Sequence, residues 1–289
     1  MSDVVLEASG LAKRYGRRTW ALEGIDLAIE RGGITALVGP NAAGKSTLIK
    51  TWIGFERPTR GAVRVAGIDP WRKRSEALEH VGYVPQSPSL YDALTVDDHL
   101  ELALMLRPTF DRAYARQRLD QLGIPIDQRA RSLSGGQQAQ VALALALGTR
   151  AEILLLDEPL ASLDPLARRE FLHVLTDAVR ADNATALLSS HIVTDVEQAC
   201  DRLMVLGVGR LLLHESVADA LAGHAIGTDG VAPPGAVATF AGPAGERLTL
   251  VRRAGSAGGD GLRPATLEEV VLGYLSSGRS TAAVGERAA

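Results

Sequence analysis

The sequence predicts an α/β fold built on a parallel sheet, and two observations support that prediction. Three short runs, at residues 34–38, 153–156 and 185–188, are apolar at almost every position. Strands that are apolar on both faces are typical of the buried middle of a parallel sheet. The first run leads into a glycine-bounded loop and then into an expected helix at residues 47–53, which Gly54 ends. A strand, a loop and a helix in this order begin a doubly wound α/β unit.

The other elements of the main domain differ in pattern from these apolar strands. The start of the chain reads as short β-strands at residues 4–8 and 21–29. Three helical patterns then lie between the first and second apolar strands. They span residues 96–107, 111–122 and 137–147. They predict a helical insertion, at about residues 88–145, that interrupts the α/β core.

A change of composition after residue 222 marks a second unit, because Gly, Ala and Pro become frequent there. It contains β-like runs at residues 236–240 and 247–251. An amphipathic helix is expected at residues 266–275, where Thr266 and Glu269 have the spacing of a capping box. We therefore expect a main domain at residues 1–222, a C-terminal appendage at residues 223–275 and a disordered tail at residues 276–289.

Composition and charge exclude several classes of protein. The net charge of −3 gives no global basic character, so we expect no nucleic-acid partner. No apolar run reaches the roughly 18 residues that a membrane-spanning helix needs, and the first residues lack a signal-peptide pattern. Cys200 is the single cysteine, which excludes an intramolecular disulfide. We interpret it as a small core residue in a reducing compartment, and we expect a cytoplasmic protein.

The glycine-bounded loop carries a phosphate-binding motif. Residues 39–47, GPNAAGKST, fit the G-x-x-x-x-G-K-[ST] pattern between a strand and a helix. Gly39 and Gly44 allow backbone N–H groups to turn toward phosphate oxygens, and the helix N-terminus favours negative charge. Lys45 would neutralise the β- and γ-phosphates, and Ser46 would offer its hydroxyl to Mg²⁺. The nucleotide-binding residues expected here are Gly39, Asn41, Ala42, Gly44, Lys45, Ser46 and Thr47.

Two acidic residues follow the second apolar strand, Ile153-Leu154-Leu155-Leu156. Asp157, at the carboxyl end of the strand, can hold Mg²⁺ directly or through water. Glu158, one residue further on, can polarise a water molecule for in-line attack. Any strand can end in an acid, so the assignment gains its weight from the phosphate loop. Together the two motifs predict an ATP site with Mg²⁺.

A second anion site is predicted at Leu133-Ser134-Gly135-Gly136-Gln137, directly before an apolar helix. Ser134 and Gln137 have the spacing of a capping box, and capping the helix could be all that they do. Two glycines beside a helix N-terminus also make a good phosphate site. The residues alone leave both interpretations open.

These motifs together resemble the ABC-type ATPases. Residues 39–47 resemble the Walker A motif of the family, residues 153–159 its Walker B motif with the catalytic glutamate, and residues 133–137 are identical to its signature. The resemblance covers about residues 4–222 and implies a P-loop NTPase (RecA-like) core, an N-terminal antiparallel β subdomain and the helical insertion. It also implies ATP hydrolysis with ATP and Mg²⁺ as ligands.

Further positions match the family in its order along the chain. Tyr15 stands where the family has an aromatic ring that stacks on adenine, and Gln86 matches the Q-loop glutamine, a catalytic and metal-binding position. Asp164, in Ser162-Leu163-Asp164, matches the D-loop, and His191 matches the switch histidine. Each alone has an ordinary alternative, such as a packed aromatic ring, a loop glutamine, a helix cap or a surface histidine.

Two positions depart from the family pattern. Ala42 stands where many related loops have glycine, and a positive φ there would cost about 1 kcal/mol. Gln140 stands where a basic residue commonly follows the signature. The signature atoms themselves are intact, but we expect an effect on helix orientation and turnover rate.

The resemblance implies a shared mechanism and membrane partners. Two chains, or this chain and a paired ATPase subunit, would face head to tail, so that Ser134, Gly135, Gly136 and Gln137 contact the nucleotide of the partner. A separate integral membrane permease would hold the protein at the cytoplasmic face of the membrane. Residues 264–270 resemble the terminal helix of ATPases that serve type-2 exporters, which move drugs, antibiotics or polysaccharides. The serious alternative is an importer ATPase.

Other classes of P-loop protein fit less well. A GTPase would need an N-K-x-D tetrapeptide, which does not occur in the sequence. A DNA-repair ABC ATPase would need long coiled coils, for which residues 96–131 are too few. Translation-associated relatives usually carry two cassettes in one chain, and this chain carries one.

Overall fold

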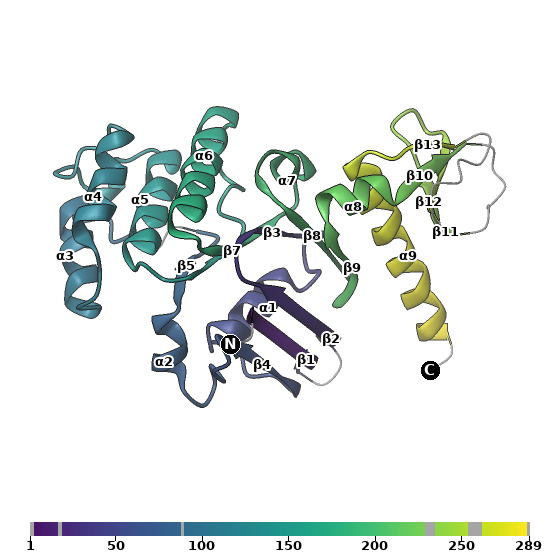
Figure 1. Cartoon of the computed structure of the whole chain (residues 1–289), viewed down its shortest axis with the longest axis horizontal. Helices are drawn as coiled ribbons and strands as arrows, with labels where there is room; N and C mark the ends of the chain where they lie inside the picture. Colours follow the sequence, from purple (N-terminus) through teal and green to yellow (C-terminus); the bar gives the residue numbers. More distant parts are fainter. Residues whose placement is uncertain (1–2, 17–18, 88–89, 229–234, 254–261, 288–289) are drawn as a thin grey trace.

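The computed structural model describes residues 3–16, 19–87, 90–228, 235–253 and 262–287. Figure 1 shows a central sheet with the helical insertion to one side and the C-terminal unit to the other. The antiparallel strands of the N-terminus lie below the central sheet in this view. Parts of the expected units lie outside the described residues: residues 1–2 of the main domain, residues 88–89 of the insertion and residues 288–289 of the tail.

The central sheet has six strands in the order β5-β6-β7-β3-β8-β9. Its strands are β3 (Gly33–Val38), β5 (Val81–Val84), β6 (Ile153–Leu156), β7 (Thr185–Ser190), β8 (Arg202–Gly207) and β9 (Arg210–Ser216). The five strands β5, β6, β7, β3 and β8 are parallel, and β9 is antiparallel to β8. The three apolar runs are thus β3, β6 and β7, which confirms the predicted α/β fold.

The N-terminal strands form a separate sheet of order β2-β1-β4, with β1 (Val4–Tyr15), β2 (Thr19–Glu30) and β4 (Arg60–Val65). Both pairings are antiparallel, and register shifts within β1 let it continue to Tyr15, well beyond the expected end at residue 8. The phosphate-loop helix α1 (Lys45–Trp52) packs against this sheet, and Trp52 Nε1 donates a hydrogen bond to the carbonyl oxygen of Glu7 at 3.0 Å. This packing fixes the helix that opens the predicted ATP site.

Helices cover the remaining surfaces of the core. They are α2 (Arg74–Glu79), α3 (Val96–Leu106), α4 (Arg112–Gln121), α5 (Gly135–Gly148), α6 (Pro165–Asp182) and α7 (Val193–Ala199). Helices α3, α4 and α5 share an apolar cluster of their own, so the insertion has a local core. Gly148 is required there, because a Cβ atom on it would lie 2.3 Å from the Phe110 ring. Helices α5 and α6 pack on the opposite face of the central sheet from α1.

The C-terminal unit is a small antiparallel sheet of order β11-β12-β10-β13 with one long helix. Its elements are α8 (Val217–Ala222), β10 (His224–Gly227), β11 (Ala236–Ala241), β12 (Arg247–Arg252), β13 (Leu262–Pro264) and α9 (Leu267–Arg287). Thr266 and Glu269 form the expected capping box, with Glu269 N donating to Thr266 Oγ1 at 3.2 Å. Burial between clusters raises the pKa of the Cys200 thiol to about 12, in line with a packing role.

Helix α9 extends into the region that was expected to be a disordered tail. Helix α9 does not stop at residue 275 but continues to Arg287. Residues 276–287 are rich in Gly, Ser and Thr, which are weak helix formers. The helix packs on the core as far as Gly278: a Cβ atom on Gly278 would meet Leu212 at 2.9 Å, and one on Gly207 would meet Leu275 at 3.3 Å. At residues 276–278, tertiary packing thus supports a helix that local propensity does not favour.

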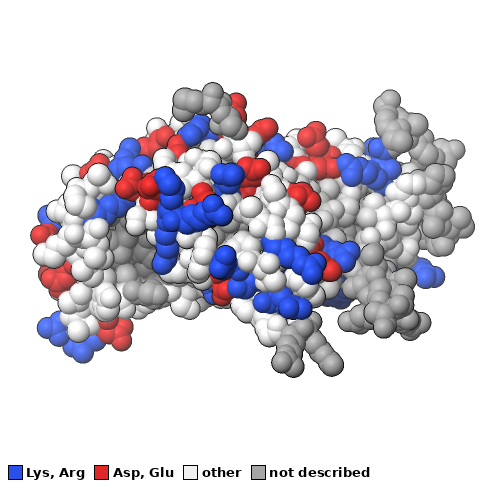
Figure 2. All heavy atoms as spheres, turned by 90° about the horizontal axis from the view of Figure 1, so that it is seen from below, with Lys and Arg blue, Asp and Glu red and all other residues white. Residues whose placement is uncertain are grey.

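The surface and the helices bear on possible partners. On the face shown in Figure 2, basic and acidic side chains are interspersed over the described residues rather than separated into one basic surface. Within the described parts of the chain, none of the helices combines the length and the apolar character that crossing a bilayer requires.

Candidate nucleotide-binding and hydrolysis site

The phosphate loop lies between β3 and α1 and depends on its glycines. A Cβ atom on Gly39 would lie 2.2 Å from the carbonyl oxygen of Leu206, and one on Gly44 would lie 2.4 Å from that of Ala21. Gly44 also has a φ of 105°. Ala42 has a φ of 64°, in the left-handed region, so this alanine carries the expected backbone cost of about 1 kcal/mol.

Lys45 reaches into the loop that precedes it. Its Nζ donates hydrogen bonds to the carbonyl oxygens of Gly39 at 2.6 Å and Pro40 at 3.1 Å. It also forms an ion pair of 2.9 Å with Glu158 Oε1, and both side chains are almost fully buried. The sequence did not predict this pair. It joins the predicted phosphate-binding cation to the predicted base.

Asp157 and Ser46 form the predicted metal-binding corner. Ser46 Oγ donates a hydrogen bond of 2.9 Å to Asp157 Oδ1, and Ser189 Oγ donates another of 3.2 Å to the same oxygen. Burial raises the pKa of Asp157, while the hydrogen bonds from the two serines act in the opposite direction. A hydroxyl and a carboxylate side by side are the protein ligands that Mg²⁺ takes beside nucleotide phosphates. The residues therefore fit a Mg²⁺ ion bound with ATP.

Glu158 is held in a strained position beside His191. It has a φ of 45°, in the left-handed region that residues other than glycine rarely adopt. Its backbone N–H donates to Ser189 Oγ at 2.7 Å, which fixes the turn. Its Oε2 lies 3.5 Å from His191 Nδ1. Ser189, which sequence analysis missed, thus orients both acidic residues from the neighbouring strand β7.

A pocket of about 420 Å³ brings most of these groups together. It is lined by Tyr15, Thr19, Trp20, Ala21, Asn41, Ala42, Ala43, Gly44, Lys45, Ser46, Thr47, Gln86 and Glu158. Eight of the predicted residues do not line this pocket: Gly39, Asp157, His191, Ser134, Gly135, Gly136, Gln137 and Asp164. The first three contact the lining residues Lys45, Ser46 and Glu158 directly. The other five lie at the starts of α5 and α6, where Ser134 and Asp164 act as the N-caps. One chain therefore gathers the P-loop half of the predicted site but not the signature half.

Tyr15 forms one wall of the pocket at the end of β1. Its ring is 41% exposed, and Lys13 Nζ lies 5.1 Å from the ring centroid. Partial burial raises the pKa of its hydroxyl, so the ring is neutral at physiological pH. An exposed, neutral aromatic ring beside the phosphate loop is suited to stacking on a base.

We expect Tyr15→Ala to weaken ATP binding about tenfold, because stacking of a base on an aromatic ring is worth about 1–3 kcal/mol. Titration with a fluorescent ATP analogue measures the effect, and GTP should compete almost as well, because every base has a π-face. Tyr91→Ala, which removes an exposed tyrosine outside the pocket, is the matched control. If Tyr15→Ala binds ATP with wild-type affinity and Trp20→Ala binds it more weakly, the base stacks on Trp20 instead.

Gln140 occupies a buried position in α5. Its side chain is 5% exposed, and neither its amide nitrogen nor its amide oxygen has a hydrogen-bond partner among the described residues. Gln138, two residues earlier, instead donates to the carbonyl oxygens of Ala130 and Leu133 at 3.3 Å. The basic residue that the family commonly has is thus replaced by an unsatisfied amide.

Replacing Gln140 with Met should stabilise the fold by about 1 kcal/mol, because an unsatisfied buried polar group is costly and Met has a similar size and good helix propensity. Denaturant unfolding of the full chain measures the change. Gln138→Met is the matched control and should be destabilising, since it removes two hydrogen bonds. A lower free energy of unfolding in Gln140→Met would mean that the amide is satisfied in solution.

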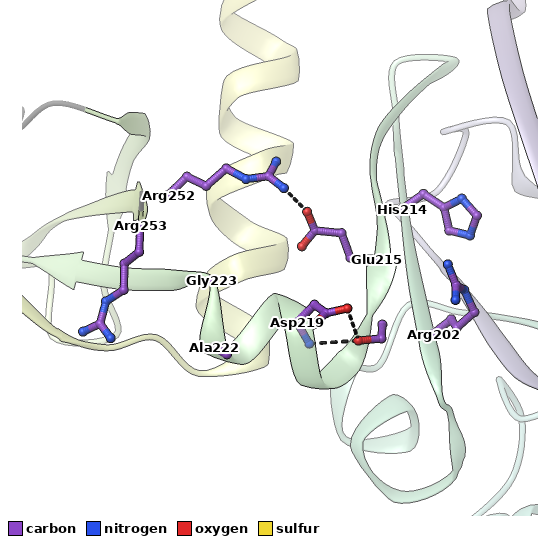
Figure 3. A pocket seen from close by; sticks show the side chains of 9 residues that line it. Arg202, His214, Glu215, Asp219, Ala222, Gly223, Arg252 and Arg253 are labelled. Atoms are coloured by element: carbon purple, nitrogen blue, oxygen red, sulfur yellow. Dashed lines mark hydrogen bonds and ion pairs between the residues drawn. The ribbon is translucent and has the colours of Figure 1, made fainter. Parts of the chain in front are cut away.

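A larger cavity of about 670 Å³ lies away from these motifs, where β9 and α8 meet the end of β12 (Figure 3). Its charged groups partly satisfy one another: Arg252 pairs with Glu215, and Ser216 hydrogen-bonds Asp219. None of the predicted site residues lines it.

The fold and the site define a P-loop ATPase with a helical insertion. Residues 22–161 match the ABC transporter family. The methionine import ATP-binding protein MetN of Mesorhizobium japonicum is 36% identical over 220 residues, which cover 73% of this chain and 60% of that protein. The Nod factor export ATP-binding protein I of Ralstonia nicotianae is 31% identical over 262 residues, which cover 86% of this chain and 79% of that protein.

Solved structures agree with this assignment. CbiO1 of Clostridium perfringens, part of the ABC transporter complex CbiONQ, superposes with a TM-score of 0.68 at 29% identity. The match covers 76% of this chain and 91% of that chain. The chain belongs to the ABC transporter family and is one of its ATP-binding cassettes, ATPases that bind ATP with Mg²⁺. The bacterial ABC transporter cassette MJ0796, which is 25% identical and superposes with a TM-score of 0.66, is dimeric in its solved structure.

Proposed function

We propose that this chain is the ATP-hydrolysing subunit of an ABC exporter of drug, antibiotic or polysaccharide type, and that it powers a separate membrane permease. The observation that favours an exporter is the C-terminal unit. The match to the Nod factor export protein extends over 262 residues, against 220 for the methionine import protein. A match that covers 86% of the chain includes part of the C-terminal unit that follows residue 222.

The roles proposed for the site residues follow from their geometry. Lys45 and the backbone of the phosphate loop hold the β- and γ-phosphates, and Ser46 and Asp157, with Gln86, hold Mg²⁺. Glu158 accepts a proton from the attacking water. His191, 3.5 Å from that carboxylate, contacts the γ-phosphate side of the site. Lys45 must leave its ion pair with Glu158 when it turns to the phosphates, which frees the carboxylate for water.

The signature residues act on the nucleotide of a second chain. Ser134 caps α5 as expected, with Gln137 N donating to Ser134 Oγ at 3.2 Å. Capping leaves Ser134 and Gly135 exposed at the surface, so the helix start is accessible to a partner. We place the dimer at the cytoplasmic face of the membrane, bound through the permease.

An importer is the second candidate, because the methionine import relative has the higher identity, at 36%. The two candidates differ in the direction of transport. We would reconstitute the tagged chain with the membrane protein encoded beside it, in vesicles whose cassettes face outward, and add ATP outside. An exporter moves a fluorescent drug or a labelled oligosaccharide into the lumen, whereas an importer empties a preloaded lumen. Outward movement would reject the exporter assignment.

A further inference from the structure

Arg168, in the first turn of α6, contacts the segment that follows Glu158. Its Nη2 donates to the carbonyl oxygens of Leu160 and Leu163, each at 3.4 Å. Its Nε lies 3.9 Å from Asp195 Oδ1, at the start of α7. The side chain is mostly buried between the two helices. Arg168 thus bridges the loop that leads from Glu158 to the D-loop and the helix that follows His191.

Asp195 continues this connection to the histidine loop. Its carboxylate is 3% exposed, and its Oδ2 accepts a hydrogen bond from Ser190 Oγ at 3.3 Å. Ser190 Oγ in turn accepts from the backbone N–H of Ile192 at 3.0 Å. The residues on either side of His191 are therefore held by one buried carboxylate.

The charges of this pair depend on each other. A buried carboxylate without a cation is costly, and removing one partner of a buried pair leaves the other uncompensated. Burial raises the pKa of Asp195, and the Arg168 charge and the Ser190 hydroxyl counteract that rise. The contact between them is an ion pair of 3.9 Å without a hydrogen bond, and Arg168 Nε has no hydrogen-bond partner among the described residues, so the burial of both groups rather than a short contact couples their charges.

His191 needs such a connection. Its side chain is 45% exposed, and its ion pair with Glu158 has a length of 3.5 Å. These contacts alone do not fix the ring, so its position depends on the loop that carries it. A small misplacement of a group beside the reacting atoms can lower a rate substantially.

The start of α6 also contacts the start of α5, the helix that follows the signature residues and is called the signature helix below. A Cβ atom on Gly136 would lie 2.9 Å from the Cβ of Ala167, the residue before Arg168. Asp164 Oδ1 accepts from the N–H groups of Leu166 and Ala167 at 2.9 and 3.0 Å. The D-loop residue, the signature helix and Arg168 therefore meet within one helical turn.

We propose that Arg168 and Asp195 are a positioning pair, which fixes His191 beside Glu158 and connects both to the D-loop and the signature helix. The inference rests on the hydrolytic function proposed above. Neither side chain lines the nucleotide pocket, so the pair acts through His191 and Glu158 rather than on ATP.

The test uses the full chain and three variants: Arg168→Met, Asp195→Asn and the double variant. We expect each single substitution to lower kcat for ATP about tenfold and to leave KM within about twofold, as for an interaction that acts on the transition state. The double variant should be no slower than the slower single variant, because the two residues act as a unit. Arg168→Lys should recover part of the rate. Arg169→Met, an exposed arginine on the same helix, is the control and should match wild type.

Amide hydrogen exchange gives a readout that does not depend on hydrolysis. Exchange at residues 190–192 should rise in Arg168→Met and Asp195→Asn but not in Arg169→Met. Unchanged exchange in this loop would overturn the proposal, and so would a wild-type kcat or independent effects in the double variant. Failure of the proposed function would give a different result. Glu158→Gln would then still hydrolyse ATP, while amide exchange at residues 190–192 would still rise in Arg168→Met and Asp195→Asn.

Discussion

Replacing Glu158 with Gln should abolish ATP hydrolysis and leave ATP binding intact. The amide cannot accept the proton of the attacking water, and loss of a general base typically lowers a rate about 10²- to 10⁴-fold. We therefore expect kcat to fall at least about 100-fold. Binding should not weaken, because Glu158 pairs with Lys45 and its neutralisation frees that ammonium for the phosphates. Phosphate release and titration with a fluorescent ATP analogue measure the two quantities.

Glu158→Gln should also accumulate as an ATP-bound dimer on gel filtration, because ATP hydrolysis, the step that opens the dimer, is blocked. Glu152→Gln is a suitable control. Glu152 precedes the same strand at its opposite end, pairs with Arg31 and His80, and lies outside the nucleotide pocket. The Glu152→Gln variant should hydrolyse ATP at the wild-type rate. Turnover in Glu158→Gln within a few fold of wild type would remove the residue from the role of base.

Local patterns were enough to predict the phosphate loop and three of the five parallel strands, β3, β6 and β7, whereas β5 and β8 were not predicted. Residues 34–38 are apolar because β3 is buried on both faces, and the glycines of the loop are needed where Leu206 and Ala21 approach the backbone. The residues that these constraints select, at positions 34–47, lie close together in sequence and so form a visible pattern, although Leu206 contacts the loop from a distant segment. The capping boxes at Ser134 and Thr266 were predicted for the same reason.

Contacts between distant segments could not be predicted in the same way. Ser189 orients Asp157 and Glu158 because β7 pairs with β6, where Leu156 aligns with Leu188. The polar residues that end β7 were a usable signal, but only the strand order places them beside the acids. The pair of Lys45 with Glu158 likewise depends on tertiary packing.

Two inactive variants should restore activity when they are mixed, if each site is shared between two chains. Lys45→Ala removes the cation of a chain's own cradle, and Ser134→Arg places a bulky side chain where the phosphate of the partner would lie. In one chain these residues belong to separate regions, because Lys45 lines the nucleotide pocket and Ser134 does not. Each homodimer should therefore be inactive in ATP hydrolysis.

In the mixed dimer, both substitutions fall in the same composite site. The other site has an intact Lys45 from one chain and an intact Ser134 from the other. With equal mixing, about a quarter of wild-type activity is expected, since about half of the dimers are mixed and each has one working site. If instead each site were built from a single chain, every chain in the mixture would carry a damaged site, and mixing would restore no ATPase activity. Strict coupling between the two sites would also give no activity, so a second measurement is needed.

Cross-linking separates these cases, with Cys200→Ala as the background so that the native thiol does not react. One tagged chain carries Asn41→Cys and the other Ser134→Cys, both at exposed positions. Gly39 is unsuitable for this purpose, because a Cβ atom there would collide with the carbonyl oxygen of Leu206. A disulfide between the chains should form with ATP, most completely in the Glu158→Gln background, and not without nucleotide. If neither the mixed dimer hydrolyses ATP nor the cross-link forms with ATP, the two phosphate-facing helix starts do not act on one nucleotide, and the signature serves only to cap α5.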